Sequence, residues 1–349
     1  KHMEFRFCSA GEIGEVMAFI DRHWAAGHVL ATSRMLMDWQ HGGTEGRDYD
    51  YVIAVDGGEI LGVLGFIVTD RYDKELVSDR VIWLTLWKIA DSAPQGVGLK
   101  LLGFLTKHVK HSAIGTQGIN DEVARLYRAL GYQVTDLEHA YVLHPDKDTF
   151  RVARVPAGAA RVAHGAASAT ALRRLDRAGL AAAAPALNAA WPAGAVPRKT
   201  ARFFCGRYLR HPFYRYRLYA VGGNDAPAGL IATRLCAAEG TLTLRVVDGI
   251  LPPDALPGLG PALQSLLVAE DAEYADLYHL GLDSGALADS GLIKRELSHN
   301  SPETTIIPNH YEPFVRSNTR IGCAYKITPD QRLIAFKADA DQDRPNQLE

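Results

Sequence analysis

The chain has 349 residues, and its 38 Lys and Arg against 40 Asp and Glu give a formal net charge of −2. Apolar residues make up 47% and charged residues 22% of the sequence, a composition typical of globular proteins with a sizeable core. No stretch is basic enough to predict a nucleic-acid surface, and no apolar run reaches the length of a membrane span. We therefore expect a cytoplasmic protein of two or three domains that binds no nucleic acid and does not insert into a membrane.

The four cysteines predict neither a disulfide framework nor a metal site. Cys8, Cys205, Cys236 and Cys323 lie far apart in the sequence, and none forms a CxxC pair. Scattered cysteines of this kind are typical of reduced or buried thiols. We expect no metal cofactor.

Taken in order along the chain, the predicted elements form an internal repeat. A short strand and an apolar helical pattern come first, then two strands around a Gly-rich turn, a long strand, a second Gly turn that opens a helix, and a helix that ends at a glycine. The matched features of the two copies are Phe5-Arg6 and Leu172-Arg173, Trp24 and Trp191, Gly57-Gly58 and Gly222-Gly223, Gly96-Val97-Gly98 and Gly258-Leu259-Gly260, and Gly131 and Gly291.

Strands that alternate with helices in this order predict an α/β fold with two mixed β-sheets flanked by helices. We expect an N-terminal unit over residues 4–145, a linker rich in Ala, Gly and Pro over 146–167, and a C-terminal unit over 168–300. Residues 301–349 do not match the repeat, and prolines break them into short extended pieces. This tail is either a wrapping segment with a disordered end or a part of the substrate site.

The first copy contains the strongest chemical signal. Residues Val81–Trp87 are β-branched and aromatic, which predicts a central strand. A Gly turn follows at Gln95–Lys100 and opens an amphipathic helix, whose N-terminus favours a phosphate group. Neither a P-loop pattern nor an early GxGxxG pattern is present, so nucleotide hydrolysis and nicotinamide chemistry lack support.

A second helix is predicted downstream of that turn. Asn120 is a natural N-cap, Val123, Leu126 and Leu130 lie on one face, and Gly131 ends the helix. With this helix the sequence resembles the GNAT superfamily of acyl-coenzyme A N-acyltransferases. The residues that carry the resemblance over about residues 50–145 are Gln95, Gly98, Asn120, Tyr127, Gly131 and Tyr132. Lys100 departs from the family pattern, which has Gly or Ala at that position.

The resemblance implies a tandem GNAT fold with coenzyme A as the acyl carrier. It implies that the backbone at Trp87, Lys88 and Ile89 pairs with the pantetheine arm like an added strand. The turn residues would then hold the pyrophosphate: Gln95, Gly96, Val97, Gly98, Leu99 and Lys100, with Asn120 on the following helix. Tyr127 would protonate the departing thiolate as general acid, unless it is an ordinary core tyrosine.

The second copy is predicted to lack a working donor site. Pro257 stands where the first copy has a glutamine, Pro261 follows Gly260, and no tyrosine lies four residues before Gly291. Proline removes an N–H group that a pyrophosphate would need. We expect one coenzyme site, in the N-terminal unit, and an acceptor pocket shaped by the C-terminal unit.

Acceptor residues are predicted in two segments. His28 is a candidate general base, and Trp39, Gln40 and His41 lie in the segment that covers the substrate in GNAT folds. The tail adds polar and aromatic candidates for binding the acceptor, unless they only cap the domain: Tyr311, Glu312, Phe314, Arg316 and Arg344.

These segments resemble a narrower group, the tandem-GNAT acyltransferases of bacterial surface-polysaccharide pathways such as lipopolysaccharide O-antigen synthesis. The resemblance implies transfer of an acetyl or small hydroxyacyl group to the amine of a dTDP- or UDP-linked amino-deoxysugar. Two alternatives stay open: an aminoacyl transferase of peptidoglycan type, and a non-catalytic coenzyme A-binding or scaffold protein on a decayed fold.

Overall fold

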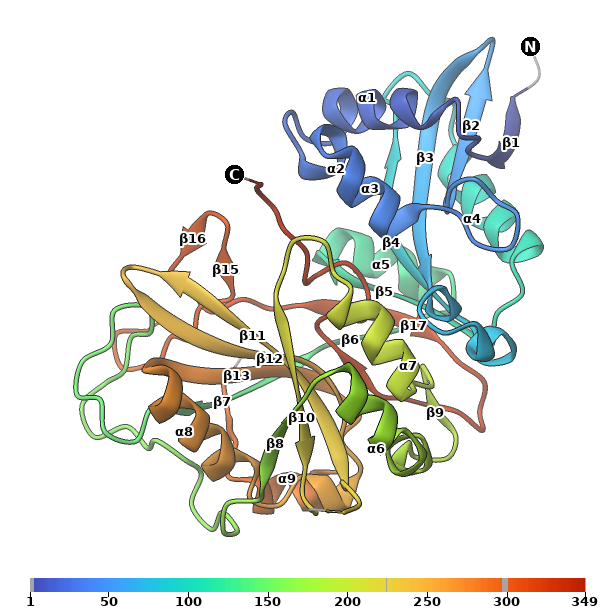
Figure 1. The fold of residues 1–349 in the computed structure, drawn as a ribbon. Helices are drawn as coiled ribbons and strands as arrows, with labels where there is room; N and C mark the ends of the chain where they lie inside the picture. The colour runs from blue at the N-terminus through green and yellow to red at the C-terminus, as the bar shows by residue number, and fades with distance from the viewer. Residues whose placement is uncertain (1–2, 224, 297–300, 349) are drawn as a thin grey trace.

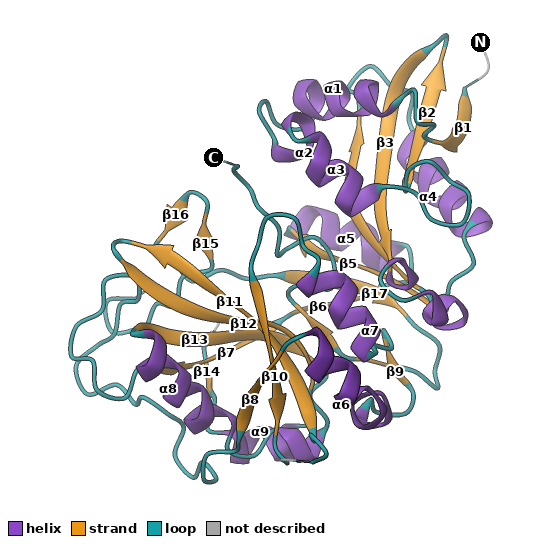
Figure 2. Ribbon diagram, viewed as in Figure 1, coloured by secondary structure: helices purple, strands orange, loops and turns teal. Residues whose placement is uncertain are grey.

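The computed structural model describes residues 3–223, 225–296 and 301–348. Two mixed β-sheets dominate it, each flanked by helices (Figures 1 and 2). In spatial order, the first sheet consists of β1 (Glu4–Phe7), β2 (Tyr51–Asp56), β3 (Glu59–Val68), β4 (Val81–Ile89), β5 (Ala113–Ile119), β17 (Gly322–Lys326) and β6 (Gln133–Asp136). The second consists of β14 (Ile293–Lys294), β7 (Glu138–Leu143), β13 (Ala272–Leu280), β12 (Thr241–Ile250), β11 (Gly229–Ala238), β10 (Tyr216–Val221) and β8 (Leu172–Leu175), with β19 (Ala335–Phe336) also paired to β13.

The α-helices are α1 (Ile13–His23), α2 (Val29–Thr32), α3 (Arg34–His41), α4 (Val97–His108), α5 (Asp121–Ala129), α6 (Arg177–Ala190), α7 (Ala201–Phe204), α8 (Leu259–Glu270) and α9 (Ser284–Ser290). Short turns of other helix types are η1 (Thr69–Arg71), η2 (Lys74–Asp79), η3 (Cys205–Leu209) and η4 (Pro253–Ala255). Two small ribbons complete the chain: β15 (His310–Tyr311) with β16 (Phe314–Val315), and β9 (Ala195–Val196) with β18 (Arg332–Leu333). Within the described ranges, no helix is long and apolar enough to cross a membrane.

Helices cover both faces of the first sheet, and the side chains of its strands point alternately toward the helices on one face and on the other. Tyr51 and Ile53 of β2 pack with α1 and α3, whereas Val52 and Ala54 pack with α4 on the opposite face. Because successive side chains of a strand point to opposite faces, a strand buried on both faces must be apolar throughout. This explains the unbroken apolar runs in β2 and β3.

The predicted repeat is visible in the fold. Each copy contains an antiparallel hairpin, β2–β3 and β10–β11, followed by a parallel pair, β4–β5 and β12–β13. Gly96 and Gly258 begin the helices α4 and α8, with φ angles of 83° and 74°. The fold class, two mixed sheets flanked by helices, is confirmed. The four cysteines are free, as expected.

The two sheets exchange a strand, which the sequence did not predict. β7 lies within the predicted N-terminal range but pairs with β13 and β14 in the second sheet. β17 comes from the tail and fills the corresponding position in the first sheet, between β5 and β6 (Figure 1). The sheets are therefore not built from continuous ranges. The alternative of a tail that only wraps the surface is wrong, because its strands belong to both sheets.

Candidate active site

The site begins where β4 and β5 separate. These parallel strands pair from Val81 and Ala113 to Leu84 and Thr116, and beyond this point their ends diverge. A cavity of about 580 Å³ opens between the diverging ends. It is lined by Trp24, His28, Thr85, Leu86, Trp87, Ile89, Gly96, Gly98, Leu99, Thr116, Gln117, Gly118, Ile119, Asn120, Val123, Leu126, Tyr127, Asp341, Gln342 and Arg344. We call it the donor cavity. Its exposed strand edges offer backbone groups to an extended ligand.

A Gly turn forms one end of the donor cavity. Gly96 has the positive φ that lets the chain turn sharply into α4, and a β-carbon placed there would meet no atom within 4 Å. The backbone N–H groups of Val97, Gly98 and Leu99 belong to the first helical turn, where intrahelical acceptors are missing. Together with the helix dipole, these donors favour a phosphate at this point.

Tyr127 borders the donor cavity from α5. Asn120 begins this helix by accepting a hydrogen bond from the Val123 N–H at 2.9 Å, and Gly131 ends it with a φ of 82°, so both predicted helix boundaries are confirmed. The Tyr127 ring is 3% exposed and contacts the rings of Trp87 and Tyr132 edge-on. Burial raises the pKa of Tyr127 well above its usual value, so the phenol keeps its proton at neutral pH.

The side chains of some predicted donor residues do not line this cavity. Trp87, Ile89, Gly96, Gly98, Leu99, Asn120 and Tyr127 line it. The Nζ of Lys88 instead lies 3.9 Å from Oδ1 of Asp91. The side chain of Val97 is buried in the core, and those of Gln95 and Lys100 are exposed to solvent. In this structure, therefore, Lys88, Gln95, Val97 and Lys100 do not contribute side chains to the cavity wall.

His28 lies in the cavity wall, but its ring nitrogens have other partners. Nδ1 faces the Leu30 N–H at 3.2 Å and caps α2, while Nε2 lies 3.2 Å from the Arg344 guanidinium. Burial, and then the charge of Arg344, lower the pKa of His28 to about 4, so the ring is neutral at pH 7. A neutral imidazole has one acceptor nitrogen, so it cannot accept from both donors at once.

The other predicted acceptor residues of the N-terminal unit lie in its core. His41 is fully buried, with Nδ1 3.0 Å from the Phe66 carbonyl and Nε2 3.0 Å from the Gln40 amide. Trp39 packs against Tyr72 and His211. The structure thus places Trp39, Gln40 and His41 outside the donor cavity, because α3 turns this face toward the sheet and the second unit.

The tail supplies a second, smaller cavity of about 170 Å³. We call it the polar cavity, and its lining consists of Tyr214, Arg234, Asn309, His310, Tyr311, Glu312, Lys337, Asp341, Gln342, Arg344 and Asn346. Asp341, Gln342 and Arg344 line both this cavity and the donor cavity. The two cavities therefore adjoin at these three residues.

Two of the predicted tail residues lie elsewhere. Arg316 is exposed and donates to the backbone carbonyls of Arg151 and Val152, and Phe314 packs against Tyr311. Neither lines the donor cavity or the polar cavity. Sequence reasoning missed Asp341 and Gln342 as site residues, although they lie three and two positions before the predicted Arg344.

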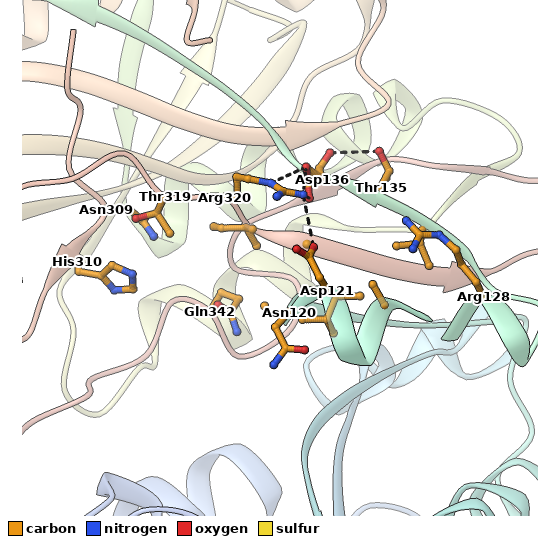
Figure 3. Close-up of a pocket in the computed structure, with 16 residues that line it drawn as sticks. Asn120, Asp121, Arg128, Thr135, Asp136, Asn309, His310, Thr319, Arg320 and Gln342 are labelled. Carbon is orange, nitrogen blue, oxygen red and sulfur yellow. Dashed lines mark hydrogen bonds and ion pairs between the residues drawn. The ribbon is translucent and has the colours of Figure 1, made fainter. Parts of the chain in front are cut away.

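A third cavity, of about 560 Å³, is also lined by Gln342 (Figure 3). Asn309 and His310 connect it to the polar cavity. Its charged side chains are Arg128, Asp121, Asp136 and Arg320, and Arg320 binds Asp136 at 3.0 Å. Gln342 lines all three cavities.

Gly118 permits the close approach of Gln342 at this junction. Its φ is 79°, and a β-carbon there would lie 2.5 Å from Gln342 Nε2. Gly118 lies at the point where the register between β5 and β17 shifts. A side chain at this position would displace Gln342 from the place where the cavities meet.

In the second unit the corresponding groove is filled by the chain itself. β12 and β13 pair from Leu242 and Ala272 to Val246 and Leu277. Beyond this point β19 pairs with β13, and the Ala338 N–H donates to the Val247 carbonyl. At the second Gly turn, a β-carbon on Gly258 would lie 1.9 Å from the Ser168 carbonyl oxygen. The tail and the segment that begins at Ser168 thus occupy the space that is open in the first unit.

Two solved structures share this architecture. A GCN5-related N-acetyltransferase from Anabaena variabilis ATCC 29413 superposes with a TM-score of 0.52 at 10% identity, over 93% of this chain and 73% of that one. A protein from Enterococcus faecalis V583, described as a probable N-acyltransferase of unknown function, superposes with a TM-score of 0.53 at 9% identity. The superposition covers 94% of this chain and 73% of that one. This chain has the GNAT fold. No protein-family model matches the sequence, and no curated protein matches it.

Proposed function

We propose that this chain is an acyl-coenzyme A-dependent N-acyltransferase with one donor site, in the N-terminal unit. The observation that carries the proposal is the contrast between the two copies of the fold. Between β4 and β5 a cavity is open, with unpaired helix N–H groups at one end and a protonated tyrosine in its wall. Between β12 and β13 the same groove is filled by β19 and the residues that follow it.

The residues present fit an acyl-coenzyme A molecule. The open space over Gly96 leaves room for a pyrophosphate against the first turn of α4. The divergent strand ends offer backbone groups to an amide-containing arm. When bound, the donor supplies a thioester, whose carbonyl carbon is the point of attack.

In the proposed reaction the acceptor nitrogen bonds to the thioester carbon and the carbon–sulfur bond breaks. Tyr127 holds its proton at neutral pH and would donate it from the phenol oxygen to the departing sulfur. The attacking amine must lose a proton. His28 was the predicted base, but the cap of α2 and the Arg344 contact both engage its nitrogens. We propose Asp341 for this step, since it lies where the donor cavity and the polar cavity meet. Gln342 and Arg344 contact its carboxylate, but each carboxylate oxygen keeps a second lone pair, unlike the single acceptor nitrogen of a neutral imidazole.

For the acceptor we propose the amine of a nucleotide-linked amino-deoxysugar. The support is the polar cavity next to the donor cavity and the resemblance of the tail to sugar-modifying tandem enzymes. Two GNAT-like units joined by residues 146–167 remain the proposed division of the chain, with β7 contributed to the second sheet and β17 to the first. A peptidoglycan-type aminoacyl transferase would be expected to carry a long helical arm. It gains no support, since the longest helix in the described part of the chain is α6, with 14 residues.

Coenzyme A binding tests the donor site directly. Calorimetric titration should give one coenzyme A per chain. Gly98→Val should weaken binding by about 10-fold or more, because the side chain would project toward Trp87 and Ile89 at the turn. Gly103→Val is the matched control, since Gly103 lies in the same helix and a β-carbon placed there would meet no atom within 4 Å. Two bound coenzyme A molecules would contradict the single-site proposal.

Turnover tests the reaction. Acetyl-coenzyme A is mixed with the chain and a panel of dTDP- and UDP-linked amino sugars, and free thiol is followed over time. We expect amine-dependent thiol release with at least one member of the panel. Binding of coenzyme A without thiol release from any member of the panel would reject the nucleotide-linked amino sugar as acceptor. If a wider set of small-molecule and peptide amines also gives no thiol release, the enzyme is rejected in favour of a coenzyme A-binding protein.

A further inference from the structure

Three aspartates follow β19 at every second position of the tail: Asp339, Asp341 and Asp343. Asp339 and Asp343 are buried, whereas Asp341 is partly exposed and lines the donor cavity. A buried carboxylate requires partners, because a charge that has left water is unstable without them. The partners of the two outer aspartates therefore show what holds this part of the tail in place.

Asp339 is bound by Lys199, which belongs to the second unit. The Lys199 Nζ lies 2.8 Å from Asp339 and 2.5 Å from Asp248 of β12, and all three side chains are buried. One ammonium thus faces two carboxylates, and each carboxylate has a further hydrogen-bond donor. Asp248 accepts a hydrogen bond from the Tyr208 phenol. Asp339 accepts one from the Phe336 N–H at 2.7 Å, which closes the turn after β19.

Asp343 is bound at the other end of the same segment, again by the second unit. The Arg234 guanidinium donates to its carboxylate at 2.7 Å, and the Tyr216 phenol donates to it at 2.5 Å. Arg207 donates to the backbone carbonyl of Asp343 at 3.2 Å, and the Lys337 ammonium lies 3.5 Å from its carboxylate. The tail is therefore anchored to the second unit on both sides of the residues that line the cavities.

Between the two anchors the tail reaches the donor cavity of the first unit. Asp341 and Gln342 line this cavity, and the Arg344 guanidinium lies 3.2 Å from His28 Nε2. The Asp341 carboxylate accepts from the Gln342 amide at 3.3 Å, and Arg344 Nε lies 3.7 Å from it. Both partners come from the same short segment, so neither fixes Asp341 relative to the first unit. Its position depends on the anchors.

We propose that Lys199 is a positioning residue, which acts through Asp339 to hold Asp341 at the donor cavity of the other unit. This inference rests on the proposed function, in which Asp341 removes a proton from the acceptor amine. Lys199 lines neither the donor cavity nor the polar cavity, so it acts only through the tail. The second copy, whose own groove is filled, thereby anchors the segment that completes the site in the first copy.

His28 reports whether the tail is in place. Burial, and then the charge of Arg344, lower the pKa of His28 to about 4, while the Asp341 carboxylate acts in the opposite direction. In the wild type the ring should therefore stay neutral between pH 5 and 8. If the tail leaves, the ring meets water and loses the guanidinium, so its pKa should rise toward the usual value of about 6.5. NMR titration of the full chain with labelled histidines measures this, and His28→Gln assigns the signal.

Two variants remove the anchor at Asp339. Asp339→Ala takes the carboxylate from the tail and leaves Lys199 paired with Asp248. Lys199→Met removes the ammonium instead. Asp339→Asn is the conservative variant, because its amide oxygen can still accept a hydrogen bond from Lys199. Lys294→Met is the control, since it removes a lysine charge from an exposed pair with Glu138. Thermal unfolding verifies that each variant is folded.

We expect His28 to titrate near pH 6.5 in Asp339→Ala and Lys199→Met, and to stay neutral in the wild type, Asp339→Asn and Lys294→Met. With an acceptor that supports turnover, Asp339→Ala should also lower kcat by about 10-fold or more, because the base is displaced. The affinity for coenzyme A should change by no more than about threefold, because the Gly turn lies apart from the anchor.

The proposal is overturned if the wild-type His28 ring titrates near pH 6.5. It is also overturned if the ring stays neutral in folded Asp339→Ala or Lys199→Met, or if Lys294→Met has the same effect as these variants. The NMR titration uses no turnover. A chain that releases no thiol would therefore reject the proposed function, while His28 would still decide whether Lys199 holds the tail.

Discussion

Replacing Tyr127, the proposed general acid, gives the most direct test of the mechanism. Tyr127→Phe removes one oxygen and leaves the ring in place, where it packs edge-on against Trp87 and Tyr132. We expect a change of no more than about 1 kcal/mol in the free energy of unfolding, since the apolar contacts of the ring are kept. The loss of a general acid should lower kcat by about 10²- to 10⁴-fold. This corresponds to about 3–5 kcal/mol in the activation barrier.

Tyr132→Phe is the matched control. Tyr132 is also buried, and burial raises its pKa to about 12, but it does not line the donor cavity. The assay follows thiol release from acetyl-coenzyme A with a saturating acceptor, at several pH values from 6 to 9. Because burial raises the pKa of Tyr127, the wild type should lose no activity through deprotonation of this acid in that range.

The reasoning fails if Tyr127→Phe retains a kcat within about threefold of the wild type, because general acid catalysis is worth far more than that. It also fails if Tyr132→Phe loses as much activity as Tyr127→Phe while both stay folded. That result would assign the effect to packing of the tyrosine pair rather than to the proton.

Two further predictions concern the residues that shape the site. Gly118→Val should destabilise the fold by about 1–3 kcal/mol in urea unfolding, because the backbone at this position is left-handed. It should also raise KM for the acceptor, because the new side chain would displace Gln342; Gly103→Val, whose β-carbon meets no neighbour, should leave KM unchanged. Burial, and then the charge of Arg71, lower the pKa of His41 to about 3, so the unfolded chain takes up a proton at this residue first as the pH falls below about 6.5. Between pH 6.5 and 5 the wild type should therefore lose about 1.6 kcal/mol more free energy of unfolding than His41→Gln, as measured by urea unfolding at the two pH values. An equal loss in the two proteins would contradict this.

The local features of the donor site could be predicted from the sequence. A Gly turn, a helix with Asn120 at its start and Gly131 at its end, and the apolar run of β4 are encoded by residues a few positions apart. Backbone φ preferences, caps and side-chain alternation act over that range and leave a readable pattern. Because the second copy repeats these patterns, its Gly turn at Gly258 could be predicted in the same way.

The acceptor side was decided by tertiary structure. His41 and Trp39 were expected at the substrate, but α3 packs both against the core. Gln342 and Lys337 reach the cavities because β17 and β19 insert the tail into both sheets. Tyr325 of β17 pairs with Gly115, about two hundred positions earlier, and strand pairing over such a separation depends on backbone hydrogen bonds that any residue can make. The sequence by itself therefore determined the Gly turn and the duplicated fold, while the tertiary structure decided which copy stays open and which side chains line the cavities.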